Sequence, residues 1–175
     1  MSRALATSRH QRAFILVVDD NQDFLSSIAA GLYKEGFAPF PTKNPDPKIR
    51  EFWCGGVDIC LTTSFEAAKQ QLADPDLTAL FVDGVLGKDN GSGSALLMHG
   101  MKEGIRPPAY AISDSQTFYD LGIAQFVEKG LLPSGENVGK NAVAVVEKVT
   151  QIVAQYKAGV VINPRWVKPP EETLG

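Results

Sequence analysis

Two apolar runs in this sequence each end in acidic side chains. Residues 14–18 lead directly into Asp19 and Asp20, and residues 79–82 lead into Asp83. Continuous apolar runs of this length are typical of strands that are buried on both faces of a parallel sheet. Because the carboxyl ends of parallel strands share one edge, we expect the three carboxylates to meet there. Their mutual repulsion requires a positive partner, either a divalent cation or a lysine.

Helix capping is the simplest alternative role for these acids, because aspartate is common at helix N-termini. Later residues favour shared chemistry instead. Ser113 follows a further apolar run at 109–112, and Lys129 follows another at 124–127. The sequence therefore predicts a hydroxyl and an ammonium group at the same edge as the carboxylates.

The composition is that of one globular domain with a substantial core. The chain has 175 residues, of which 44% are hydrophobic and 21% are charged. Its net charge of −3 gives no general attraction to nucleic acid or to an anionic membrane. No apolar run approaches the roughly 20 residues that cross a bilayer. Cys54 and Cys60 match neither a redox nor a zinc motif, which favours reduced thiols and a cytoplasmic protein.

The alternation of strand and helix patterns predicts an α/β fold, a doubly wound five-stranded parallel sheet with helices on both faces. The expected strands are 14–18, 57–61, 78–82, 109–112 and 124–127. The expected helices follow Asn21 as far as Gly36, then Thr63 (as the N-cap) to Leu72, 94–102, a short one at 115–121, and 137–156.

A Pro-rich insert at 38–56 separates the first helix from the second strand. Its four prolines exclude a central strand, and we expect one turn of helix near residues 49–53 whose aromatics cover the domain. A partner-binding insert with an exposed Trp53 is the alternative. We therefore divide the chain into a mobile tail (1–12), one domain (13–156) and a C-terminal extension (157–175).

The sequence resembles receiver domains of two-component response regulators in the order of the polar residues that follow its expected strands. The matching strings are ILVVDDN, LFVDGVL, AISDS and FVEKG, spread over roughly residues 14–156. The resemblance implies a flavodoxin-like fold, a three-layer sandwich, and phosphorelay signalling through a phosphorylated aspartate.

The resemblance also implies a role for each polar strand end. Asp83 is expected to be the nucleophile that takes a phosphoryl group, and Lys129 to pair first with Asp83 and then with the phosphoryl oxygens. Ser113 is expected to donate its hydroxyl to one of those oxygens. Phe126, three residues before Lys129, matches the family's aromatic switch position, with an ordinary core role as the alternative.

Magnesium is the cofactor that the resemblance implies. Asp20, Asp83 and the backbone carbonyl of Val85 are expected to be its protein ligands, and Asp19 is expected to act through metal-bound water. Mg²⁺ prefers such a site, with few carboxylates and several waters. The expected activity is self-phosphorylation and dephosphorylation of one aspartate rather than turnover of a substrate.

A histidine kinase or a phosphotransfer protein is the implied phosphodonor. Little chain follows the last helix, so we expect a stand-alone receiver whose output is contact with a downstream protein. The alternative is a degenerate receiver that acts as an interaction module without phosphate. Asp114 beside the phosphosite, and Gly130 where the family usually has proline, motivate that alternative. A haloacid-dehalogenase-type hydrolase is disfavoured because Val85 stands where its second acid would be.

Overall fold

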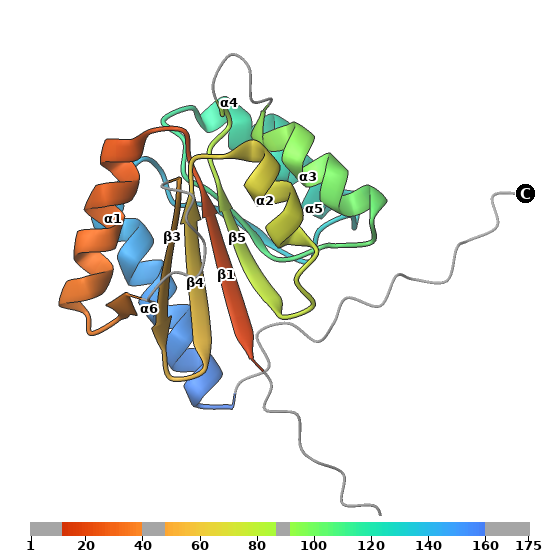
Figure 1. Ribbon diagram of the computed structural model, residues 1–175. Coiled ribbons are helices and arrows are strands. Elements are labelled where there is room, and N and C mark those ends of the chain that lie inside the picture. The colour runs from red at the N-terminus through yellow and green to blue at the C-terminus, as the bar shows by residue number, and fades with distance from the viewer. Residues whose placement is uncertain (1–11, 40–47, 87–91, 160–175) are drawn as a thin grey trace, which may run out of the picture.

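The computed structural model describes residues 12–39, 48–86 and 92–159, and its elements form a seven-stranded sheet with helices on both faces (Figure 1). The predicted tail at 1–12 and extension at 157–175 lie almost wholly outside these ranges. The strands are β1 (Ala13–Val18), β2 (Ala38–Pro39), β3 (Ile49–Cys54), β4 (Val57–Thr62), β5 (Leu77–Val82), β6 (Ala109–Ala111) and β7 (Gly135–Asn137). The helices are α1 (Gln22–Lys34), α2 (Phe65–Leu72), α3 (Gly93–Lys102), α4 (Gln116–Phe118), the π-helix η1 (Tyr119–Ile123), α5 (Ala124–Glu128) and α6 (Ala142–Lys157).

The sheet has the order β2-β3-β4-β1-β5-β6-β7. The five strands from β4 to β7 are parallel, and counted along the chain they stand in the order second, first, third, fourth, fifth. This is the flavodoxin-like order, in which ligands bind at the carboxyl edge where β1 meets the third parallel strand. The predicted α/β, doubly wound, flavodoxin-like fold is confirmed, with two additional antiparallel strands at one edge.

The central strands are buried on both faces, as their apolar sequences predict. In β1, Ile15 and Val17 face the layer of α1 and α6, while Leu16 and Val18 face the layer of α2 and α3. All four are fully buried, because each face of the sheet is covered by its own pair of helices (Figure 1). This burial on both sides holds the carboxyl ends of β1 and β5 in a fixed register.

Most crossover helices begin with a side-chain cap soon after the preceding strand or loop. Asn21 caps α1, Ser64 caps α2, Ser92 caps α3 and Asn141 caps α6, each accepting a hydrogen bond from a backbone N–H three residues on. The predicted cap Thr63 is therefore wrong by one residue. Gly36, with φ of +88°, ends α1 as expected.

The strand predicted at 124–127 is wrong, because these residues form the helix α5. A short apolar run bounded by turn residues does not distinguish a strand from a buried helix segment. The fifth parallel strand is instead β7, which has the sequence Gly-Glu-Asn and lies half-exposed at the sheet edge. No apolar run marks β7 as a strand. The helix predicted at 137–156 therefore began too early, because Asn137 ends β7 and α6 begins at Ala142.

The described part of the insert forms strands rather than the expected helical turn. Strand β3 pairs antiparallel with β4, and β2 pairs with β3. Alternation along β3 buries Phe52 and leaves Trp53 47% exposed. The expected burial of Trp53 is wrong, because successive residues of a strand point to opposite faces.

Gly31 tests the packing of α1 against α6. A Cβ at this position would lie 2.7 Å from Cγ2 of Val146. Gly→Ala in a helix usually stabilises a protein by about 0.5–1 kcal/mol. Here the β-branched Val146 has little rotamer freedom within α6, so we expect Gly31→Ala to lower the free energy of unfolding by roughly 1–3 kcal/mol. Urea denaturation measures this change.

Ser27→Ala is the matched control, because Ser27 lies on the exposed side of the same helix. We expect its free energy of unfolding to stay within about 0.5 kcal/mol of the wild type. Gly31→Ala with wild-type or higher stability would contradict the close packing of α1 on α6.

Candidate functional site

Three carboxylates meet where β1 and β5 end side by side. Asp19, Asp20 and Asp83 each offer one oxygen, and these oxygens all lie within 4.8 Å of one another. The backbone N–H of Asp83 donates to the carbonyl of Val18 (3.0 Å), which continues the ladder between the two strands into the site. Asp19 and Asp83 are buried, whereas Asp20 is exposed. The predicted convergence of the three acids is thus present in the structure.

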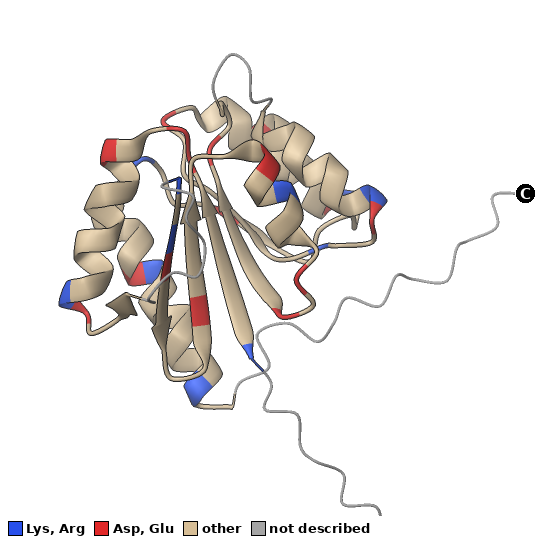
Figure 2. Cartoon of the chain, viewed as in Figure 1, with Lys and Arg blue, Asp and Glu red and all other residues tan. Residues whose placement is uncertain are grey.

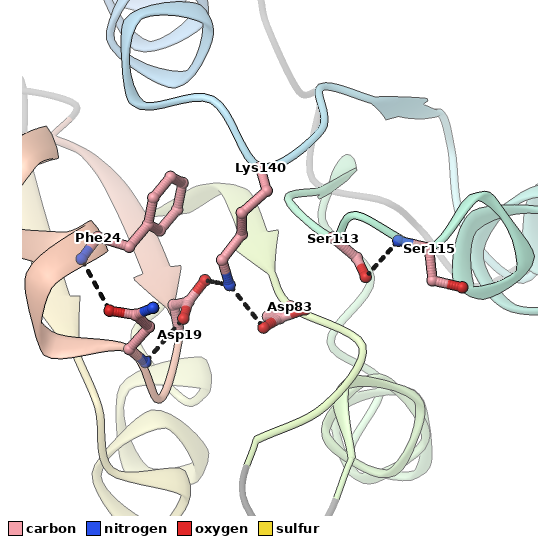
Figure 3. A network of polar contacts seen from close by, with 7 residues as sticks. Asp19, Phe24, Asp83, Ser113, Ser115 and Lys140 are labelled. Atoms are coloured by element: carbon pink, nitrogen blue, oxygen red, sulfur yellow. Dashed lines mark hydrogen bonds and ion pairs between the residues drawn. The ribbon is translucent and has the colours of Figure 1, made fainter.

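The positive partner of these acids is Lys140. Its Nζ contacts Oδ2 of Asp19 and lies 2.7 Å from Oδ2 of Asp83, so the ammonium group bridges the two carboxylates (Figure 3). The same Nζ lies 4.8 Å from the centroid of the Phe24 ring, a favourable cation–π distance. Lys140 is therefore held from three directions.

The prediction that Lys129 pairs with Asp83 is wrong, because the lysine that contacts Asp83 is Lys140. Lys129 lies exposed at the C-terminus of α5, followed by Gly130 with φ of +70°. A lysine at the end of a helix followed by a left-handed glycine is a common helix C-terminus. The string FVEKG therefore marks the end of a helix and not the end of a strand.

A local sequence signal could have identified Lys140. It directly precedes Asn141, the N-cap of α6, just as Asp20 directly precedes Asn21, the N-cap of α1. In both places the functional residue lies between a strand and a capped helix. The signal was missed because β7 has no apolar run to mark it as a strand.

Ser113 lies at the end of β6, the strand next to β5, on the far side of Asp83 from Asp19 (Figure 3). It is buried, and its Oγ accepts a hydrogen bond from the backbone N–H of Ser115 (3.1 Å). The hydroxyl proton is free to be donated to a further acceptor. Asp114, the next residue, is exposed.

Two other predicted positions lie differently in the fold. Phe126 is on α5, half-buried against the core layer of α2 and α3, and not at a strand end. Val85 is two residues beyond Asp83 and forms an isolated bridge with Ser92, with its side chain 68% exposed. The role of its carbonyl as a metal ligand stays a prediction.

Burial and charge act in opposite directions on the ionisable groups of the site. Burial raises the pKa of Asp19 to about 6, against the lowering effect of Lys140 and of the Asn21 N–H, and the Asp83 charge adds to the rise. Burial would lower the pKa of Lys140, but its hydrogen bonds and ion pairs with Asp19 and Asp83 outweigh this and raise it. The ammonium group therefore stays protonated, while the buried Asp19 holds its charge with difficulty.

Acidic residues are visible at the edge where β1 and β5 end, whereas basic residues are scattered in this view rather than gathered in a patch (Figure 2). Three carboxylates against one ammonium group leave an excess of two negative charges. A divalent cation would offset that excess, so the donor set fits a hard metal ion with oxygen ligands.

Comparisons with known proteins identify the fold. No protein-family model matches the sequence, and no curated protein matches it significantly. The N-terminal domain of an uncharacterized protein from Wolinella succinogenes superposes with a TM-score of 0.54 at 15% identity, over 85% of this chain and 98% of that chain. The signal receiver domain of an HD domain-containing protein from Pseudomonas fluorescens superposes with a TM-score of 0.52 at 14% identity, over 91% of this chain and 95% of that chain. A response regulator receiver protein from Pseudoalteromonas atlantica superposes with a TM-score of 0.51 at 20% identity, over 82% of this chain and 99% of that chain.

The chain has the receiver fold. The predicted resemblance to receiver domains is thereby confirmed for the architecture. The site described above lies at the carboxyl edge of this fold, where ligands of flavodoxin-like sheets bind.

The raised pKa of Asp19 predicts how pH acts on the metal-free protein. A carboxyl group whose pKa is higher in the folded than in the unfolded state favours folding when protonated. We therefore expect the free energy of unfolding to fall as the pH rises from about 4 to about 6. In Asp19→Asn this fall should be absent. Urea denaturation across this pH range measures it. Wild-type pH dependence in Asp19→Asn would contradict the assignment, and Asp114→Asn is the control.

The same pKa predicts the pH dependence of metal binding. Below about pH 6, Asp19 carries a proton and the site loses a negative charge, so a divalent cation offered to these acids would have to compete with that proton. We expect the Mg²⁺ affinity to fall as the pH drops through this value, and calorimetric titration measures it. Asp19→Asn should bind Mg²⁺ weakly at every pH, and an affinity that does not change between pH 5 and 8 would contradict the prediction.

Proposed function

We propose that this protein is a response-regulator receiver that accepts a phosphoryl group on Asp83. The observation that carries the proposal is the bridging position of Lys140, whose Nζ contacts Asp83 and Asp19 at the carboxyl edge of a receiver fold. Phosphoryl transfer to a carboxylate needs an exposed edge for the donor, a fixed nucleophile and neutralisation of negative charge. Asp83, Lys140 and the neighbouring acids offer these features together.

The proposed reaction forms one bond and breaks another. A carboxylate oxygen of Asp83 attacks the phosphorus of a phosphohistidine on the donor protein, and the P–N bond of the phosphoimidazole breaks. The imidazole leaves with the bonding electron pair and takes up a proton, and Asp83 becomes an acyl phosphate. Lys140 then pairs with a phosphoryl oxygen, and Ser113 donates its hydroxyl to another.

The residues present fit a magnesium ion. Asp19, Asp20 and Asp83 offer hard oxygen atoms within 4.8 Å of one another. Asp20 and Asp83 would be ligands together with the backbone carbonyl of Val85, and Asp19 would act through metal-bound water. Mg²⁺ prefers oxygen ligands and retains several waters, so a few carboxylates, one of them exposed, are a sufficient protein contribution. When bound, the ion would neutralise charge on the transferring phosphoryl group. The acids and Lys140 would hold the nucleophile in place.

The proposed partners are a histidine kinase or a phosphotransfer protein as donor, and a downstream protein that reads the phosphorylated state. A role without nucleic acid or membrane contact agrees with the net charge of −3. Within the described ranges, no helix combines the length and apolar character required to cross a bilayer. The stand-alone role and the cytoplasmic location stay predictions.

The phosphorylation-independent interaction module is the second candidate. Asp114 adds an exposed negative charge next to Ser113, where it would repel an anionic donor. The charge of Asp114 would slow the approach of an anionic donor, whereas the Lys140 bridge bears on whether Asp83 can accept a phosphoryl group at all. We therefore place the phosphoacceptor function first.

Intact-mass analysis after incubation with Mg²⁺ and acetyl phosphate tests the proposal. We expect one phosphoryl adduct on wild-type protein and none on Asp83→Asn. Lys140→Ala should lower the rate of adduct formation on the order of 10²-fold, because it removes the charge that neutralises the phosphoryl oxygens. No adduct should form when Mg²⁺ is chelated before acetyl phosphate is added.

Lys129→Ala is the matched control, because it removes the same charge from the exposed end of α5. Its rate of adduct formation should equal that of the wild type. A wild-type protein without any adduct would overturn the phosphoacceptor function and favour the interaction module. Equal rates for Lys140→Ala and wild type would overturn the role of Lys140.

A further inference from the structure

The insert gives the sheet an acidic and aromatic surface beside α2. In Figure 1, α2 and α3 lie to the right of β3 and do not cross it. Because successive residues of a strand alternate between faces, Glu51 and Trp53 of β3 share this side of the sheet with Asp58 and Cys60 of β4. The register places Trp53 opposite Asp58 and Glu51 opposite Cys60. The five parallel strands alone would not form this surface.

The surface is hollowed where β1, β3 and β4 meet the end of α2. The hollow has a volume of about 140 Å³, and its lining includes Phe14, Cys60, Gln71 and the three acids Glu51, Asp58 and Asp74. Phe14 and Cys60 are buried, whereas the three acids are half-buried. A space of roughly 150 Å³ holds a group of the size of benzene. The hollow is therefore large enough for one side chain and too small for a folded element.

The acids of the hollow carry like charges. No ion pair between two residues of the described ranges includes Glu51, Asp58 or Asp74. The lysine of the adjoining helix, Lys69, pairs instead with Glu66 on the same helix. Half-buried like charges repel one another more strongly than fully exposed ones, because less water screens them. The hollow therefore favours a cationic ligand.

The spacing of these acids favours an extended organic cation over a metal ion. Among the residues that the structure describes, the only group of acids close enough to hold one metal ion together is the cluster of Asp19, Asp20 and Asp83. Cys60 does not add a thiolate to the hollow, because burial, together with the charge of Glu51, raises the pKa of its thiol to about 12.

The Cys60 thiol is a buried polar group in the lining of the hollow. Its residue is 1% exposed, and within the described ranges it makes no hydrogen bond. Its Sγ can accept a hydrogen bond from an N–H group. A guanidinium group offers such N–H donors together with the positive charge that the acids favour, and with its adjoining methylenes it has about the size of benzene.

Trp53 adds a contact area outside the hollow. It stands opposite Asp58 and is 47% exposed. Guanidinium groups stack on aromatic rings and bind carboxylates through two parallel hydrogen bonds, whereas an ammonium group is compact and strongly hydrated. Trp and Arg are also enriched among the residues that contribute most to binding in protein interfaces. An exposed indole beside the hollow therefore favours an arginine carried by a protein segment over a free small molecule.

We propose that the hollow is a docking site for an arginine side chain on a basic segment of a partner protein. The guanidinium group pairs with Glu51 and Asp58 above Cys60, and the residues that flank the arginine lie on Trp53. Partner binding by the insert is the alternative that the sequence leaves open, and the exposure of Trp53 favours it.

This docking site is separate from the acidic cluster at the carboxyl edge. Phe14, in the hollow, is the second residue of β1, whereas Asp19 directly follows the end of that strand. Five residues of a strand span roughly 16 Å. A partner can thus dock here without covering Asp83, and the proposal does not rest on phosphoryl acceptance.

Backbone-amide NMR titration of the full chain with N-acetyl-arginine amide tests the chemistry of the ligand. We expect shifts at the residues of the hollow and of β3, with a dissociation constant of about 1 mM, as is usual for a ligand of this size. N-acetyl-citrulline amide has nearly the same shape without the charge and should cause no shifts there. Equal shifts with both compounds, or none with the arginine compound, would overturn the proposal.

The same titration with the blocked pentapeptide Gly-Leu-Arg-Leu-Gly tests the docking of a segment. Its leucines can contact Trp53, so we expect roughly tenfold tighter binding than for N-acetyl-arginine amide. Trp53→Leu should lose this gain, and Tyr33→Leu, which removes another exposed ring from α1, should keep it. A pentapeptide that binds no tighter than the single residue would indicate a small-molecule site and overturn the docking of a partner segment.

Glu51→Gln and Asp58→Asn test the acids, because each removes a charge and keeps the shape of the side chain. Each should weaken binding of the pentapeptide roughly fivefold or more. Glu128→Gln is the matched control, since it removes an exposed acid from the end of α5, and it should bind like the wild type. Wild-type affinity in both hollow variants would overturn the proposal. Asp83→Asn should also bind normally, so the failure of the phosphoacceptor function would leave this docking site intact.

The chain's own arginines are another source of a guanidinium group. Arg3 and Arg9 precede β1, the strand that contributes Phe14 to the hollow. The double variant Arg3→Gln/Arg9→Gln should bind the pentapeptide with wild-type affinity. Tighter binding in this variant would mean that the chain's own arginines compete for the hollow, and it would overturn the assignment to a partner protein.

Discussion

The site depends on one ammonium group shared between two buried carboxylates. Lys140 bridges Asp19 and Asp83 at the edge where their strands lie side by side, and the exposed Asp20 adds a third acid. Burying a carboxylate without a partner is costly, and the raised pKa of Asp19 shows that part of this cost persists despite the lysine. A site in this state is favourable for a divalent cation, since the acids outnumber the ammonium group and their geometry is already fixed by the sheet. The energetic cost of keeping these acids charged is thus the feature that suits the cluster to a cation.

The rest of the fold acts as a rigid frame for this cluster. The two core layers bury both faces of β1 and of β5, so neither strand can slip by one residue relative to its neighbours without disturbing both layers. Near the site the frame is less uniform, because the helical stretch made of α4, η1 and α5 contains a π-helix, and Phe118 within it packs against Gly84 and Gly93. The charges thus lie at the ends of regular, buried strands, whereas an irregular helix lies beside them.

The acids Asp19, Asp20 and Asp83 and the hydroxyl of Ser113 could be predicted from the sequence, because each follows a strand with a clear apolar pattern. The apolar runs before Asp19 and Asp83 are rich in β-branched and aromatic residues, which favours buried strands, and parallel strands bring their carboxyl ends to one edge. The lysine was assigned to the wrong position because two patterns were ambiguous. The run 124–127 is as compatible with a buried helix as with a strand, and β7, at the half-exposed sheet edge, requires no apolar residues.

By itself, then, the sequence determined the fold class, the parallel core and three of the charged positions, because these follow from hydrophobic periodicity and local capping. The tertiary structure decided which lysine faces Asp83, that the insert adds two antiparallel strands, and that Phe118 packs against Gly84 and Gly93. The choice of lysine and the packing of Phe118 depend on contacts between residues far apart in the chain, such as Asp83 with Lys140. No local pattern records such a pair, because its energy exists only after the strands and helices have packed together.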